Sequence, residues 1–177
     1  ESKSIDWLSF DIAPGGIPNG PYQSLAIGYQ FYLAYKAALP EYKHAFSYAN
    51  VARIRREIKN PRNTCIVYIF RLPEYAEFRH WGPINYIAPP NRIIMTPKVA
   101  KKLSGNSLSL AELLENSPLR LGVMEGRGYR VPEILGAHQG SNKITKIFSN
   151  SQSIYSMLQV GRLDYTLGDW VELAFME

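Results

Sequence analysis

The residues best suited to bind a ligand lie at Gly126-Arg127-Gly128, directly after an apolar stretch that ends at Met124. A glycine-rich turn between a strand and a helix exposes backbone N–H groups, and the helix dipole favours a negative charge there. The segment lacks the third glycine of a G-x-G-x-x-G nucleotide loop, since Val131 takes its place. Phe148 stands where a ribose-binding acid would be expected. A dinucleotide site is therefore excluded, while an anion-binding loop and an ordinary turn both remain open.

No set of catalytic or metal-binding residues can be named. The three histidines show no metal-ligand spacing, and neither H-E-x-x-H nor G-x-S-x-G occurs. Cys65 is the one cysteine, which excludes an internal disulfide, and it lies in an apolar run where thiols are usually inert. Asp11 and Asp169 could serve a site, but aspartates at strand ends more often cap helices. We therefore expect a non-enzyme without a cofactor or metal.

These residues must be positioned by strands and helices that alternate along the chain. The sequence predicts strands at 5–10, 45–48, 65–70, 91–96, 119–124, 144–148 and 163–167, and helices at 28–39, 50–59, 110–114, 129–137 and 151–160 and after Asp169. The run 65–70 is the most apolar and is predicted to be a buried central strand. The alternation predicts an α/β protein. A composition shift near residue 95 divides it into lobes at 1–94 and 95–177.

Composition and charge favour a folded protein that does not bind nucleic acid. The chain has 177 residues and a formal net charge of +5, with 12% aromatic residues. Its basic helix carries Val51, Ile54 and Ile58 on one face, which places the arginines on the solvated face. No stretch reaches the roughly 20 apolar residues that span a bilayer. The chain begins at Glu1, so we expect it to be processed or trimmed, with any export signal already removed.

The segment 161–169, which reads GRLDYTLGD, resembles the G-R-x-D-x-x-x-x-D stretch of type 2 periplasmic solute-binding proteins. These form extracellular solute-binding protein family 3, the substrate-binding type of bacterial ABC transporters. Similar matches in the correct order cover nearly the whole chain: Ile5-Asp6-Trp7 with Asp11 and Pro14, then 71–75, 81–83, 109–113 and 121–126.

The resemblance implies an α/β fold of two lobes, each a mixed sheet flanked by helices, that close on a small-molecule solute. It implies a periplasmic or otherwise extracytoplasmic monomer whose partner is a membrane permease or a sensor protein. Asp169 matches the acid that pairs with a ligand ammonium, Arg127 and Gly128 match an anion-binding loop, and Arg71 and Leu72 match first-lobe positions that line the cleft. The cleft aromatics would come from Trp7, Tyr68, Tyr75, Trp81 and Tyr129, of which we expect about half to be core.

Two departures from the family pattern limit what the resemblance implies. Tyr75 stands where amino-acid binders carry the arginine that grips the ligand carboxylate, and a phenol cannot replace a bidentate guanidinium. Unless Arg71, Arg79 or Arg127 takes over that role, we therefore expect a small polar or aromatic organic solute rather than an ordinary α-amino acid. The sequence also lacks the segment that would return to the first lobe. The alternatives are a periplasmic dehydratase-like enzyme using Asp11, Glu74 or Asp169, and an interaction module without a ligand.

Overall fold

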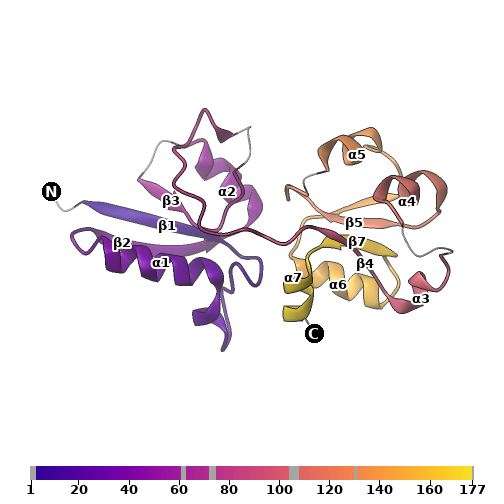
Figure 1. The fold of residues 1–177 in the computed structure, drawn as a ribbon, viewed down its shortest axis with the longest axis horizontal. Coiled ribbons are helices and arrows are strands. Elements are labelled where there is room, and N and C mark those ends of the chain that lie inside the picture. Colours follow the sequence, from indigo (N-terminus) through magenta and orange to yellow (C-terminus); the bar gives the residue numbers. More distant parts are fainter. Residues whose placement is uncertain (1–2, 61–62, 72–74, 104–107, 130, 177) are drawn as a thin grey trace. The chain divides into compact units, whose positions relative to one another are not determined.

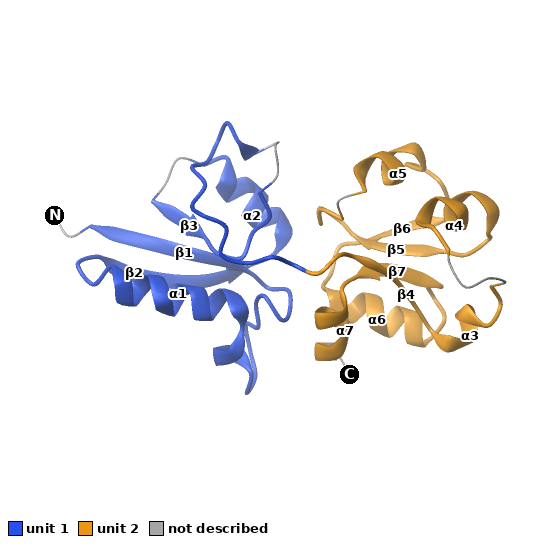
Figure 2. Ribbon diagram, in the orientation of Figure 1, with its two compact units in different colours: residues 1–88 blue, residues 89–177 orange. Residues whose placement is uncertain are grey.

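The computed structural model describes residues 3–60, 63–71, 75–103, 108–129 and 131–176. They form two compact units, Glu1–Ala88 and Pro89–Glu177, which Figure 2 distinguishes by colour. The sequence places the division at about residue 95. The structure assigns 89–94 to the second unit because the strand that begins at Arg92 belongs to its sheet. No helix within the described ranges is long and apolar enough to cross a membrane.

The first unit is built on a parallel sheet of three described strands. These are β1 (Ser4–Phe10), β2 (Lys43–Ala49) and β3 (Thr64–Ile66), in the order β2-β1-β3. A short 3-10 turn, η1 (Gln23–Leu25), precedes α1 (Ile27–Ala38), and α2 (Val51–Ile58) joins β2 to β3 (Figure 1). Parallel strands require such crossovers. The mixed sheet implied for each lobe is therefore not what the described strands of this unit form.

Both faces of β1 are buried, each under a different helix. Trp7 and Leu8 are neighbours in the strand and so point to opposite faces. Trp7 packs in a cluster with Tyr32 of α1, whereas Leu8 packs in a cluster with Ile54 and Ile58 of α2. The central strand of the first unit is therefore β1.

The predicted buried strand at 65–70 is wrong in length and in position. β3 ends at Ile66, pairs only with β1 among the described strands, and leaves Cys65 exposed. Tyr68 has φ 56°, a left-handed conformation that a strand cannot continue through. The apolar side chains of the run instead divide between the two clusters, with Val67 on the α1 side and Ile66 on the α2 side.

The second unit has a mixed four-stranded sheet in the order β4-β7-β5-β6. Its strands are β4 (Arg92–Met95), β5 (Leu121–Met124), β6 (Ile144–Ile147) and β7 (Tyr165–Gly168), and its helices are α3 (Pro97–Ala100), α4 (Leu110–Asn116), α5 (Pro132–Ala137), α6 (Ser151–Gln159) and α7 (Trp170–Met176). β4 runs antiparallel to β7, and β5 is parallel to β6 and β7. The α/β class predicted from the sequence is confirmed, and the predicted strands and helices follow one another in the predicted order, with α3 as an additional short helix.

The topology of this sheet brings four chain segments to one edge. The parallel strands β5, β6 and β7 all end there, and the antiparallel β4 begins there. Figure 1 shows α5 on one side of the sheet and α6 and α7 on the other. The connections after β5 and β7 therefore leave toward opposite faces of the sheet. Open α/β sheets place ligand-binding residues at the edge where two connections diverge in this way.

Candidate functional site

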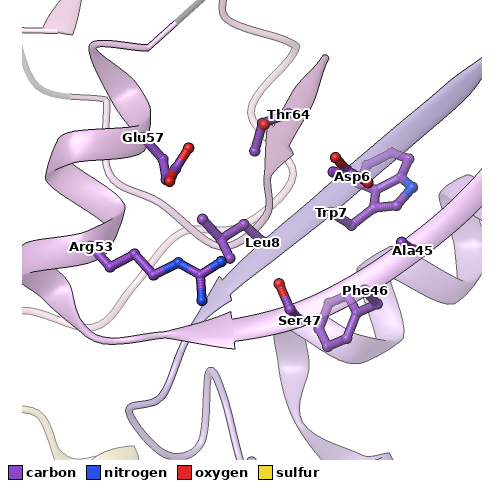
Figure 3. Close-up of a pocket in the computed structure, with 9 residues that line it drawn as sticks. All are labelled: Asp6, Trp7, Leu8, Ala45, Phe46, Ser47, Arg53, Glu57 and Thr64. Carbon is purple, nitrogen blue, oxygen red and sulfur yellow. The ribbon is translucent and has the colours of Figure 1, made fainter. Parts of the chain in front are cut away.

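A shallow pocket of about 130 Å³ lies in the first unit, over the face of the sheet that α2 covers (Figure 3). Arg53 and Glu57 reach it from α2, and Leu8 forms part of its floor. The full lining is Asp6, Trp7, Leu8, Ala45, Phe46, Ser47, Arg53, Glu57 and Thr64. Small-molecule sites usually enclose about 300–1,000 Å³, so this pocket is smaller than a typical ligand site. Of the predicted site residues, only Trp7 lines it.

Asp11 and Tyr68 lie where the strands of the first sheet end. The Asp11 backbone N–H donates to the carbonyl of Ala49, 3.1 Å away, which places the residue beside the start of α2. Burial raises the pKa of the Asp11 carboxyl above its usual value. The Tyr68 ring packs against Gly15 so closely that a Cβ at that glycine would overlap it. These two predicted residues therefore reach the same edge of the sheet.

Trp7 and Tyr75 are held in the core of the first unit. Trp7 is 5% exposed, donates from Nε1 to His44 Nδ1 at 2.9 Å, and stacks on Tyr35 with ring centroids 5.3 Å apart. Tyr75 is 6% exposed and belongs to the cluster of Leu8. Both residues are therefore buried in the core of this unit. Of the five aromatic candidates, three are buried, namely Trp7, Tyr75 and Tyr129.

The other two first-unit candidates lie in the irregular segment after β3. Arg71 is exposed, and its guanidinium carbon lies 5.8 Å from the centre of the Trp81 ring, which is cation–π range. Leu72 lies outside the described residues. The structure therefore gives Arg71 an aromatic neighbour and leaves Leu72 as a prediction.

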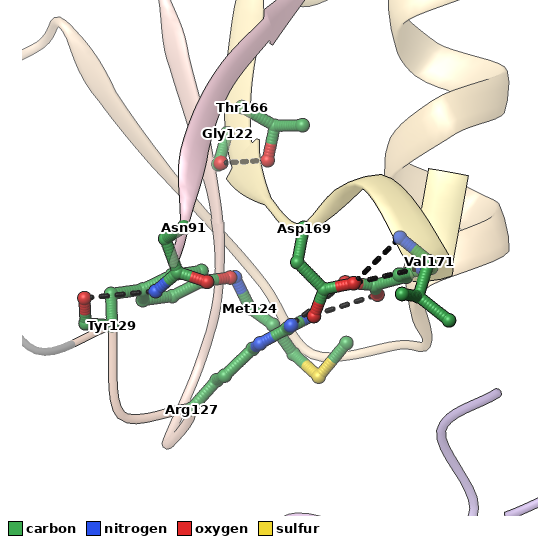
Figure 4. A network of polar contacts seen from close by, with 9 residues as sticks. Asn91, Gly122, Met124, Arg127, Tyr129, Thr166, Asp169 and Val171 are labelled. Carbon is green, nitrogen blue, oxygen red and sulfur yellow. Dashed lines mark hydrogen bonds and ion pairs between the residues drawn. The ribbon is translucent and has the colours of Figure 1, made fainter. Parts of the chain in front are cut away.

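The second unit holds the main polar network, at the carboxyl ends of β5 and β7 (Figure 4). Arg127, in the loop after β5, donates from both terminal nitrogens to the carboxylate of Glu172 in α7, at 2.8 and 2.7 Å. The Glu172 side chain is 2% exposed and that of Arg127 17%. This bidentate geometry is the strong form of an arginine–carboxylate pair. The predicted anion-binding arginine thus already holds a carboxylate of its own chain.

The loop that carries Arg127 and Gly128 is fixed by Tyr129. The Tyr129 hydroxyl accepts a hydrogen bond from the Met124 N–H at 2.7 Å, and Asn91 Nδ2 donates to the Tyr129 carbonyl at 2.9 Å. The guanidinium carbon of Arg127 lies 5.3 Å from the centre of the Tyr129 ring. Tyr129 therefore ties the loop to β5 and to the start of β4.

Asp169 begins α7 as its N-terminal cap, which confirms that part of the sequence prediction. Its Oδ1 accepts hydrogen bonds from the N–H groups of Val171 at 3.0 Å and Glu172 at 2.9 Å. Both bonds use one oxygen, so within the described residues Oδ2 keeps its capacity to accept from a donor. The same residue that orients Glu172 therefore also presents a carboxylate oxygen at the sheet edge.

Tyr155 of α6 completes the network beside Gly168. Burial, and then the negative charge of Glu172, raise the pKa of the Tyr155 hydroxyl, which therefore stays protonated. A Cβ added at Gly168 would lie 2.8 Å from the Tyr155 oxygen and 2.9 Å from Ile94 Cδ1. Glycine at this position lets β7 pass close to both side chains. Within the described ranges no three His, Cys, Asp or Glu side chains gather as metal ligands.

Sequence reasoning missed Glu172, Asn91 and Tyr155. Arg127 and Glu172 are 45 positions apart, and the pair forms only once β5 and β7 are neighbours. The sequence did contain one signal for Glu172: it is an acid three residues after a capping aspartate, which places it in the first turn of the helix. That spacing fixes Glu172 beside the cap but does not reveal its partner.

No protein-family model and no curated protein matches the chain. Among solved structures it is similar to the AvGluR1 ligand-binding domain with phenylalanine, at 13% identity and a TM-score of 0.66 over 99% of this chain and 73% of that one. The same domain with glutamate is 16% identical, with a TM-score of 0.67 over 97% of this chain and 71% of that one. An ancestral arginine-binding protein bound to glutamine is 17% identical, with a TM-score of 0.62 over 99% of this chain and 73% of that one.

Identities this low establish a shared fold and nothing finer. The shared features are the alternating strands and helices and their division into two α/β units. The chain therefore has the fold of type 2 periplasmic-binding-protein-like domains, as its sequence predicts.

Proposed function

We propose that this chain binds a small polar or aromatic organic solute and does not act as an enzyme. The observation that carries the proposal is the polar network of Arg127, Glu172, Tyr129 and Asp169 at the carboxyl edge of the second sheet. The chain shares its fold with domains whose structures were solved with phenylalanine, glutamate, arginine and glutamine. Carboxyl edges are where open α/β sheets bind their ligands.

The first unit would contribute Asp11 and Tyr68 from the carboxyl edge of its own sheet. Contacts from both units would favour a closed arrangement over an open one, since a ligand shifts an equilibrium toward the state that it binds better. The protein would then report or deliver its solute to a membrane permease or a sensor in the periplasm. It would do so as a monomer.

Ordinary α-amino acids fit this proposal poorly, because the arginines that could hold an α-carboxylate are otherwise engaged. Tyr75 takes the family position and is buried. Arg79 donates to the carbonyls of Glu57 and Asn60, the latter at 3.0 Å. Arg127 is paired with Glu172. Of the arginines considered, Arg71 is the one that lies exposed, and it stacks on an indole.

A thermal-shift screen of amines, sugars, aromatic acids, peptides and amino acids tests the proposal. A solute at about 100 times its Kd should stabilise the chain by about 2.7 kcal/mol, which raises Tm by several degrees in a protein of this size. Calorimetric titration of each hit then gives its affinity. The absence of any stabilising compound across these classes would contradict the proposal.

A dehydratase-like enzyme on the same fold is the second candidate. Asp11 favours it, because burial raises the pKa of this carboxyl, as a proton donor requires. Product formation from arogenate or prephenate, lost in Asp11→Asn and in Asp169→Asn, would support this function. Stoichiometric binding without turnover would exclude it.

A further inference from the structure

The charge of Arg127 is fully matched inside the second unit. Both of its terminal nitrogens donate to Glu172, at 2.8 and 2.7 Å, and one face of its guanidinium covers the Tyr129 ring. A ligand carboxylate or phosphate that approached the two terminal nitrogens end-on would compete with Glu172 for the same two donors. The pairing also neutralises the charge that would attract an anion to Arg127.

Displacing Glu172 is unfavourable because this carboxylate is buried. Its side chain is 2% exposed, and a buried charge that loses its partner is strongly destabilising. Its backbone is fixed as well, since the Glu172 N–H donates to the Asp169 cap. On the other side, Tyr129 anchors the arginine loop to Met124 and Asn91. These contacts fix the backbone on both sides of the ion pair.

The charged side chains of the network do not cancel one another. Arg127 contributes one positive charge, and Glu172 and Asp169 contribute two negative ones, so the sum is one negative charge. The neighbouring Tyr155 is neutral, because burial and the charge of Glu172 raise its pKa. An incoming cation or N–H donor would meet a favourable potential, whereas an anion would meet repulsion.

We propose that Glu172 is a positioning residue that sets the charge selectivity of the second unit. By pairing with Arg127 it neutralises the guanidinium and weakens the attraction of this loop for an anionic group, so this part of the site favours an ammonium or an uncharged donor group of the solute. The inference rests on the proposed function, because it names the class of group that the solute presents here. Stability alone does not require the pair, since apolar residues of similar volume often replace buried ion pairs without loss.

Sulfate, a bidentate anion that needs no knowledge of the solute, tests the occupation of Arg127. We would titrate sulfate into the full chain and follow the amide signals of Gly126 and Gly128 by NMR, with Glu172→Gln as the variant that frees the guanidinium. The matched control is Arg127→Gln/Glu172→Gln, which keeps side-chain size and removes both charges. Saturable shifts are expected in Glu172→Gln at concentrations at least about tenfold below those needed in the natural chain and in the control. Equal responses of the natural chain and Glu172→Gln would overturn the proposal.

Phenethylammonium and phenylacetate test the selectivity itself, since they share a ring and differ in charge. The natural chain should bind the ammonium at least about tenfold more tightly, and Glu172→Gln should narrow that ratio. The double variant keeps Asp169, so its preference should match that of the natural chain within about twofold. This last comparison stands even if Glu172→Gln does not fold. A loss of phenylacetate affinity of about tenfold in the double variant would mean that Arg127 binds the anion, and would overturn the proposal.

The two arms separate this inference from the proposed function. If sulfate behaves as expected and the thermal-shift screen finds no stabilising compound, the role of Glu172 is supported and the proposed solute binding is wrong. If the aromatic probes bind without the expected preference for the ammonium, solute binding is supported and the role of Glu172 is wrong.

Discussion

Asp169 serves the fold and the proposed ligand with different oxygens. Its Oδ1 caps α7 through the N–H groups of Val171 and Glu172. The cap needs an acceptor, which asparagine also provides, whereas attraction of an ammonium needs the charge. The structural and ligand-binding roles of this residue can therefore be separated by substitution.

Asp169→Asn should leave the free energy of unfolding within about 0.5 kcal/mol of the natural value, and Asp169→Ala should lower it by about 1 kcal/mol. Both variants should bind cationic solutes more weakly, because both remove the negative charge that is not paired with Arg127. Urea unfolding measures the first effect, and calorimetric titration with phenethylammonium measures the second.

Asp164→Asn is the matched control for this pair of variants. Asp164 also flanks β7, but it accepts hydrogen bonds from the backbone and the side chain of Arg120, at 2.8 and 3.0 Å, at the other end of the strand. Its replacement should leave solute affinity unchanged. Unchanged affinity in Asp169→Asn would contradict a ligand role for that carboxylate and leave only the cap.

At this scale the sequence identifies residues better than it identifies their partners. The family pattern and the glycine-rich turn placed Asp169 and Arg127 at strand ends, and both are there. The ion pair with Glu172 was not predicted, because it joins residues 45 positions apart and depends on the order of the strands. The burial of Trp7 and Tyr75 was likewise undecided until the helices that cover them were known.

At the scale of elements, predictions held where the signal was local. The Ser109–Glu112 capping box begins α4, the Asn50 side chain caps α2, and Gly161 follows α6 with φ 73°. The strand predicted at 65–70 was wrong because burial is a tertiary property. Its apolar side chains pack as well from an irregular segment as from a strand, and Tyr68 turns the chain away from the ladder.

The junction between β7 and α7 makes a prediction about packing. Gly168→Ala should lower the free energy of unfolding by about 1–3 kcal/mol, because its Cβ would lie 2.8 Å from the Tyr155 oxygen and 2.9 Å from Ile94 Cδ1. Combining it with Tyr155→Phe should restore part of the loss, since the phenol oxygen is removed. Urea unfolding of the four forms measures this coupling.

Gly136→Ala is the control for the added methyl group. Gly136 lies in α5, and a Cβ there would meet nothing within 4 Å. Alanine in an open helical position should be neutral or stabilise by up to about 1 kcal/mol. A loss equal to that of Gly168→Ala would show that contact with Tyr155 and Ile94 is not the cause.

At the scale of the whole molecule, each unit has its own sheet and its own buried residues. Ile54 is 0% exposed under the first sheet, and Leu121 is 0% exposed within the second. Replacing either with alanine leaves a cavity that costs about 2–5 kcal/mol. Ile54→Ala and Leu121→Ala can therefore mark which calorimetric transition belongs to which unit.

These two variants allow the contribution of each unit to solute binding to be measured separately. A ligand stabilises what it binds by RT ln(1 + [L]/Kd), so a solute held by both units should raise the transition of the weakened unit in both variants. In each variant, the unit that keeps its full core should unfold at the higher temperature. The solute should raise the unfolding temperature of the weakened unit toward that of the intact unit, because the weakened unit binds the solute only when it is folded. A solute that raises only the transition marked by Leu121→Ala would restrict the site to the network around Arg127 and Asp169. That result would remove Asp11 and Tyr68 from the proposed binding residues.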